Sequence, residues 1–121
     1  GIFGNTGYSH IGRISTPDYV AEISDFLNSL EHITMTVTTG IFNHMLFFSV
    51  RTKNGVAASL IAERIAKDLN GTGGGHPNMA AGRIPTHKKE EQTIRVFKER
   101  LLSYLNLNDE RTTKILPAIR R

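Results

Sequence analysis

The sequence predicts a single small α/β domain in which a central mixed sheet is flanked by helices. Its 121 residues are the size of one ordinary domain and too few for two separate cores. Apolar residues recur at helical spacing in three segments, and three other segments have the pattern of strands. Helical and strand segments that alternate along one short chain indicate helices packed on a sheet.

The first helix is predicted over residues 17–30. Thr16 precedes Pro17, whose missing N–H costs nothing in the first turn of a helix, and Asp18 adds an acid there. Polar residues separate the apolar ones, so the helix is amphipathic. Its expected apolar face consists of Val20, Ile23, Phe26, Leu27 and Leu30.

Residues 33–52 predict two strands joined by a turn. Ile33, Met35 and Val37 alternate with threonines, which is typical of a strand with one buried face. The turn is expected at residues 40–43. The segment 44–52 is apolar on both of its faces, so we predict it in the middle of the sheet.

A helix over 56–69, a short strand over 79–85 and a helix over 89–105 complete a predicted core of about residues 13–105. The basic tail, 106–121, shows no assignable element. Residues 83–121 carry ten Lys and Arg against five Asp and Glu, whereas the rest of the chain is nearly balanced. A basic half attracts polyanions, but a solvated helix face explains a charge of this size equally well.

Composition excludes several functional classes. The chain has no cysteine, which excludes disulfides, thiol catalysis and cysteine zinc sites and fits a reducing cytoplasm. The longest apolar run has four residues, 45–48, far below the roughly 18 that a membrane span needs. His10, His32, His44 and His87 share no metal-ligand spacing. We therefore predict a cytoplasmic protein with no membrane partner and no cofactor bound to this chain.

A glycine-rich segment, 71–82, is the strongest candidate for chemistry. Successive glycines adopt backbone conformations closed to other residues, and their N–H groups can form an anion-binding nest. His76 follows them and can donate a hydrogen bond to a phosphate oxygen. Two known phosphate-binding patterns fail, because His76 replaces the last glycine of the dinucleotide fingerprint and no Lys-Ser/Thr pair follows the glycines. From the residues alone, a flexible glycine turn is an equally good interpretation.

The run Gly73-Gly74-Gly75-His76, with Met79-Ala80-Ala81-Gly82 after it, resembles the Gly-Gly-Gly-His…Ala-Gly signature of the DHH-associated domain. That domain is the C-terminal substrate-binding module of DHH-family phosphoesterases, among them RecJ-type exonucleases, nanoRNases and exopolyphosphatase-related proteins. The resemblance covers residues 13–85 well and the rest loosely. Three further stretches follow the order of the exopolyphosphatase-related branch: Ser15-x-Pro17-Asp18, Asp25-Phe26-Leu27 and Phe48-Ser49-Val50-Arg51.

The resemblance implies a phosphate-binding site in a Gly-Gly-Gly-His loop at one end of the sheet. In the family, the histidine that matches His76 contacts a substrate phosphate, and a strand arginine that matches Arg51 holds it as well. The glycines that line the same pocket are Gly73, Gly74 and Gly75. Asn78 is a possible contact to a base or ribose, although turn chemistry explains it equally well. We expect Arg51 and His76 to converge on one phosphate and to lie outside the apolar core.

The resemblance also implies that catalysis belongs to a separate N-terminal DHH domain, whose Asp and His residues bind two divalent metals, usually manganese. This sequence contains no Asp-His-His, and Asp18, Asp25 and Asp68 lie on or at the ends of predicted helices without a histidine in ligand spacing. The chain is thus expected to be the inactive substrate-recognition part of a metal-dependent phosphoesterase. Its expected partners are the DHH domain and a short oligonucleotide or phosphorylated nucleotide. The alternatives are a stand-alone nucleic-acid-binding module and an interaction domain, both without a hydrolase partner.

Aromatic residues supply a further hypothesis, because nucleic-acid-binding proteins stack bases on aromatic rings. Phe47 and Phe48 point to opposite faces of one predicted strand, so core packing is the expected role of both. Phe42 lies in the predicted turn and is the candidate for stacking.

Overall fold

The computed structural model describes residues 2–3, 5–30, 32–53, 57–105 and 112–113, which form one sheet and three helices. The seven strands lie in the order β5-β6-β4-β3-β2-β1-β7. Their bounds are β1 Ile2–Phe3, β2 Thr6–Arg13, β3 Met35–Phe42, β4 Met45–Thr52, β5 Thr72–His76, β6 Met79–Pro85 and β7 Thr112–Thr113. Among the strands of the described residues only the pair β2–β3 is parallel, so the predicted mixed sheet is confirmed.

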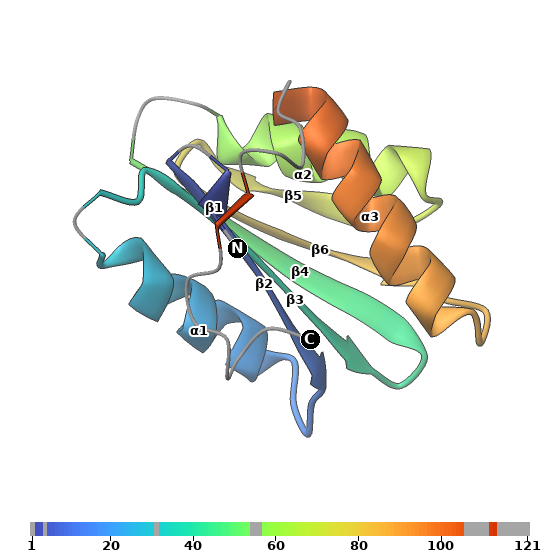
Figure 1. Ribbon diagram of the computed structural model, residues 1–121. Helices are drawn as coiled ribbons and strands as arrows, with labels where there is room; N and C mark the ends of the chain where they lie inside the picture. Colours follow the sequence, from blue (N-terminus) through green and yellow to red (C-terminus); the bar gives the residue numbers. More distant parts are fainter. Residues whose placement is uncertain (1, 4, 31, 54–56, 106–111, 114–121) are drawn as a thin grey trace.

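Helices cover both faces of the sheet, as Figure 1 shows, which confirms the predicted α/β class. Helix α1 (Asp18–Asn28) connects the parallel strands β2 and β3 and packs on β3 and β4. Helices α2 (Ala58–Asp68) and α3 (Glu90–Leu105) lie on the opposite face. We call these two surfaces of the sheet the α1 face and the α2/α3 face. No helix among the described residues is long and apolar enough to cross a lipid bilayer.

The main core lies between the α2/α3 face and its helices. Phe48 of β4 is buried against Phe97 of α3, with ring centroids 5.1 Å apart. Leu46 and Val50 point to the same face at alternate positions and are also fully buried. The structure confirms the predicted central position of this strand, since β4 pairs with β3 on one side and β6 on the other.

Helix α1 packs through a stripe that matches the predicted one only at Val20 and Leu27. Its buried residues are Val20, Ser24 and Leu27, while Phe26 is 54% exposed. The sheet beneath α1 presents small hydroxyl residues such as Thr36 and Thr38, so a serine fits against it and a phenylalanine does not. The predicted apolar face of this helix is therefore wrong at Phe26.

Strand β2 is absent from the prediction because most of its residues are small or polar. Residues 6–10 are all buried nevertheless, and His10 Nδ1 lies 2.7 Å from Thr39 Oγ1 of the parallel strand β3. The turn expected at 40–43 is also displaced. Asn43 and His44 both have positive φ, 50° and 57°, as a two-residue type I′ hairpin requires, and β3 runs on to Phe42.

The glycine-rich segment is an edge strand, β5, and not the expected loop. A Cβ on Gly73 would lie 2.7 Å from the carbonyl oxygen of Ala62, so the glycine lets α2 approach β5 closely. Gly73 and Gly74 have no positive φ, so they do not form the alternating-handed backbone of an anion nest. The chain turns at Pro77 and Asn78, between β5 and β6.

A polar contact joins α3 to α2 and predicts a pH-dependent contribution to stability. The Tyr104 hydroxyl donates a hydrogen bond to Asp68. Burial raises the pKa of Tyr104 above the ordinary 10.0, and the bond to Asp68 raises it further. A group whose pKa is higher in the folded state stabilises the fold below its unfolded pKa and loses that contribution as pH rises through its folded pKa.

Tyr104→Phe should therefore lower the free energy of unfolding by about 0.5–1 kcal/mol at pH 8, because one hydrogen bond is lost. The difference from the wild-type protein should shrink as pH rises above about 10. Urea unfolding at pH 8 and at pH 11 measures both values. Equal differences at the two pH values would contradict this assignment of the Tyr104 hydroxyl.

Candidate phosphate-binding pocket

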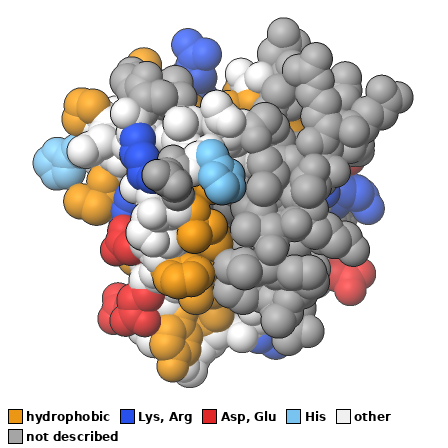
Figure 2. All heavy atoms as spheres, turned by 60° about the vertical axis from the view of Figure 1, so that its left-hand side comes forward, with side chains coloured by type: hydrophobic (Ala, Val, Ile, Leu, Met, Phe, Trp, Pro, Cys, Tyr) orange, Lys and Arg blue, Asp and Glu red, His pale blue; other side chains and the backbone are white. Residues whose placement is uncertain are grey.

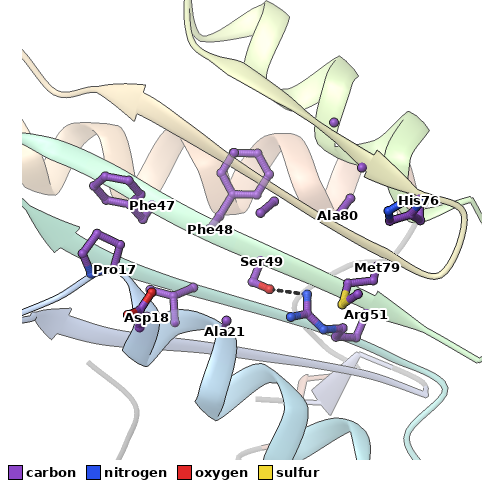
Figure 3. A pocket seen from close by; sticks show the side chains of 15 residues that line it. Pro17, Asp18, Ala21, Phe47, Phe48, Ser49, Arg51, His76, Met79 and Ala80 are labelled. Carbon is purple, nitrogen blue, oxygen red and sulfur yellow. Dashed lines mark hydrogen bonds between the residues drawn. The ribbon is translucent and has the colours of Figure 1, made fainter.

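A pocket of about 370 Å³ lies on the α1 face, between the start of α1 and strands β4, β6 and β5. It exists because α1 packs on β3 and β4, while the same face of β5 and β6 is largely exposed; Met79 is 46% exposed. Figure 3 shows the pocket with α1 on one side and the strands on the other. Its volume is in the range of small-molecule sites in proteins.

The sheet register brings Arg51 and His76 to this pocket. Arg51 of β4 pairs with Met79 of β6, and Met79 pairs with His76 of β5. Residues that pair across strands point to the same face, and two strand spacings separate the Arg51 and His76 backbones by about 10 Å. Both residues line the pocket, and Figure 3 places Met79 between them.

Arg51 is buried, which corrects the expectation that it lies outside the core. Only 8% of the surface of Arg51 is exposed, and three hydrogen bonds hold its guanidinium. Nε donates to Asp25 Oδ1 at 2.8 Å, and Nη1 donates to Ser49 Oγ at 2.6 Å and to the Val50 carbonyl oxygen at 3.2 Å. A buried charge is costly unless it is paired, and Asp25 supplies the pairing. Among the described residues Nη2 has no hydrogen-bond partner, so two N–H donors remain for a ligand.

His76 ends the edge strand β5 and is exposed. Its ring has no hydrogen-bond partner within the described part of the chain and is therefore open to a ligand. Figure 3 shows it at the same end of the pocket as Arg51, on the far side of Met79. The two side chains do not contact each other, because the Arg51 guanidinium turns back along β4 toward Ser49.

The other predicted site residues divide into two groups. Gly74 and Gly75 line the pocket with His76, whereas Gly73 does not line it and faces α2. Asn78 is exposed in the hairpin turn, and its backbone carbonyl accepts a hydrogen bond from the Thr52 N–H at 3.0 Å. It does not line the pocket, so the structure gives it a role in the turn.

Sequence reasoning missed residues that α1 contributes to the pocket. Asp18 and Ala21 line it directly, and Asp25 holds Arg51. These three positions share one side of the helix, at i, i+3 and i+7. This stripe lies beside the buried stripe of α1. Its acidic and small residues are the feature of the sequence that could have identified these positions.

The phenylalanines also differ from expectation. Phe48 is in the core as predicted, but Phe47 is only partly buried and lines the pocket. Phe42 ends β3 and does not line the pocket, although its ring lies 6.3 Å from that of Phe47. Phe47 is not part of the core because its side of β4 borders the part of the sheet that α1 does not cover.

Charge on the surface around α1 is mixed. Figure 2, in which this side of the molecule comes forward, shows hydrophobic side chains beside a group of acidic ones, with Lys and Arg scattered. On the described part of this view no continuous basic patch forms, so anion binding here depends on individual groups in the pocket. Within the described residues, no group of three His, Asp or Glu side chains is placed to hold a metal ion.

Comparisons with known proteins identify the fold and the family. Residues 5–103 match the model of the DHHA1 domain. An uncharacterized protein of Methanocaldococcus jannaschii is 33% identical over 86 residues, which are 69% of this chain and 17% of that protein. The chain thus spans under a fifth of the length of this relative.

Two solved structures share the fold. The C-Ala domain of Aquifex aeolicus alanyl-tRNA synthetase superimposes with a TM-score of 0.64 at 19% identity, over 84% of this chain and 96% of that domain. An exopolyphosphatase-related protein from Bacteroides fragilis gives 0.59 at 17% identity, over 86% of this chain and 31% of that protein. The family match confirms the resemblance that the glycine–histidine signature indicated: this chain belongs to the DHHA1 domain family.

Proposed function

We propose that this domain is the substrate-recognition part of a DHH-type phosphoesterase and binds a phosphate group of a short nucleic acid or a nucleotide. The observation that carries the proposal is the joint placement of Arg51 and His76 in one pocket on the α1 face. The matched family and the exopolyphosphatase-related fold neighbour support it.

The chemistry of the pocket suits a phosphate. Asp25 and Ser49 fix the Arg51 guanidinium, which leaves its Nη2 donors with a defined direction. A fixed guanidinium binds phosphate with charge-assisted hydrogen bonds, and its pre-organisation reduces the entropy lost on binding. His76 lies on the opposite side of Met79 and supplies a donor from the edge strand. A phosphate between them would be bound from two strands.

Hydrolysis is proposed to belong to a DHH domain in the longer protein. The described residues do not fit a two-metal centre, since no three ligating side chains gather. We therefore assign the two divalent metals, manganese by resemblance, to the N-terminal DHH domain that we propose as the covalent partner of this domain. A cytoplasmic location remains a prediction.

A second candidate is an RNA-recognition module attached to another kind of enzyme. The match that favours it is the C-Ala domain of an alanyl-tRNA synthetase, of which this fold covers 96%. The two candidates differ in one observable: a phosphoesterase carries a metal domain and hydrolyses the bound ligand, and a recognition module does not.

Binding of a 5′-phosphorylated, dye-labelled trinucleotide, measured by fluorescence anisotropy, tests the proposal. Affinity should be weak and should fall with salt, because Arg51 and His76 contact only one or two phosphates of the ligand. For single strands, one or two phosphate contacts predict a slope of about −0.7 to −1.4 in a plot of log K against log salt. Hydrolysis by the full-length protein with manganese, but not by this domain alone, separates the two candidates. Tight binding that is indifferent to salt would contradict both.

A further inference from the structure

The pocket has two ends of different chemistry, and only one of them suits a phosphate. Figure 3 shows Arg51, His76 and Met79 at one end and Phe47, Pro17 and Asp18 at the other. Phe47 precedes Arg51 by four residues on β4, so their backbones lie about 13 Å apart along the strand. A single phosphate does not fill both ends.

The end of the pocket at Phe47 and Pro17 offers an aromatic surface. The Phe47 ring is partly buried and packs at 6.3 Å from Phe42, with the ring planes tilted by 58°. Pro17 lines the pocket from the start of α1, so the Phe47 ring has an apolar neighbour across the opening. Ala21 and Ala81 add only small side chains to the lining. A flat heterocycle fits such a surface, and stacking on an aromatic ring is the usual way in which proteins hold single-stranded bases.

Asp18 decides which kind of ligand suits this end. Its side chain is exposed, and none of the described residues donates a hydrogen bond to its carboxylate. An ionised carboxylate only accepts hydrogen bonds, so it repels a second phosphate and attracts a group with N–H donors. Guanine has two adjacent donors, its ring N1–H and its amino group, which match the two carboxylate oxygens. Adenine and cytosine place a ring acceptor beside their amino group, and uracil places carbonyls beside its only N–H.

We infer that Phe47, Pro17 and Asp18 form a nucleobase subsite that selects guanine, so that a guanine nucleotide with its phosphate at Arg51 and His76 fills the pocket. This inference rests on the proposed function, because the phosphate end orients the nucleotide. It excludes inorganic polyphosphate as the preferred ligand. A chain of phosphates would have to pass the Asp18 carboxylate and would leave the Phe47 ring unused.

The test compares ligands and variants in the full-length protein, with metal chelated so that nothing is hydrolysed. Guanosine, adenosine and uridine 5′-monophosphates and tripolyphosphate each compete with a labelled dinucleotide. The wild-type protein should bind the guanine nucleotide about five- to tenfold more tightly than the uracil nucleotide. Asp18→Asn should abolish that preference and strengthen tripolyphosphate binding about twofold or more. Phe47→Ala should weaken all three nucleotides by roughly five- to 100-fold and leave tripolyphosphate unchanged.

Two matched control residues lie on α1, outside the pocket. Phe26 is a 54% exposed phenylalanine and Glu22 an exposed acid, and neither lines the pocket. Phe26→Ala and Glu22→Gln should leave all four affinities unchanged. If His76→Ala weakens every ligand while Phe47→Ala and Asp18→Asn change nothing, the base subsite is wrong and the proposed function stands. If wild-type protein binds none of the ligands, or His76→Ala binds all of them normally, the proposed function fails as well.

Discussion

His76→Ala in the full-length protein should reduce kcat/KM of the proposed phosphoesterase by about tenfold to 150-fold while leaving the melting temperature nearly unchanged. A hydrogen bond to a charged group contributes about 1.5–3 kcal/mol, which sets this range. The fold should survive because His76 is exposed at the end of an edge strand, and its ring contributes no hydrogen bond to the described structure. The matched control is Asn78→Ala, two residues away, which is exposed and outside the pocket.

Arg51 requires a different design, since it is buried and bonded to Asp25 and Ser49. Arg51→Ala should lose both binding and stability, so a loss of activity alone would not identify its role. Arg51→Lys keeps the charge but not the planar fork, and it should lower kcat/KM by about tenfold or more with a smaller loss of stability. Activity, melting temperature and trinucleotide affinity are measured together. Full activity in both His76→Ala and Arg51→Lys would remove the two residues from the site.

Much of the fold follows from local signals in the sequence. Strand β6 is predicted with its observed bounds because Pro85 ends it, and α3 is predicted to within one residue at its start because its apolar residues recur at helical spacing. Strand β6 has a stop signal and α3 has a period. Strand β2 has neither, because most of its buried residues are polar or small; His10, for example, pairs with Thr39, 29 residues away. Only the tertiary fold reveals that they are buried.

The site is predictable to a smaller extent. The family resemblance points to His76 and Arg51 as candidate site residues, but the partner of Arg51 depends on the rotation of α1. Asp25 is 26 residues from Arg51 in sequence, and it reaches the guanidinium only because Val20, Ser24 and Leu27 face the sheet. The prediction that placed Phe26 in the core rotates the helix differently. A modest error in the predicted buried face of α1 is therefore enough for the prediction to miss the acidic residues of the pocket.

The adjacent glycines Gly73 and Gly74 allow packing and binding to be separated by single substitutions. Gly73→Ala should destabilise the protein by about 1–3 kcal/mol, because the new Cβ would lie 2.7 Å from the backbone oxygen of Ala62 and 3.2 Å from the Cβ of Ala66. Neither α2 nor the edge strand β5 can move apart to make room for the methyl group without losing packing contacts between them. Gly74→Ala should leave stability within about 0.5 kcal/mol, since the nearest atom to its Cβ is the flexible Glu63 carboxylate at 3.9 Å.

The same pair of variants distinguishes two roles for the glycine run. The Gly74 side of β5 faces the pocket, so a methyl group there should weaken trinucleotide binding while the melting temperature stays constant. Gly73→Ala should lower the melting temperature, and the fraction that remains folded should bind normally. Urea unfolding and anisotropy titration of both variants give the four values. The reverse result, a stable Gly73→Ala that fails to bind, would mean that Gly73 contacts the ligand and that the close approach of α2 is not the reason for a glycine at this position.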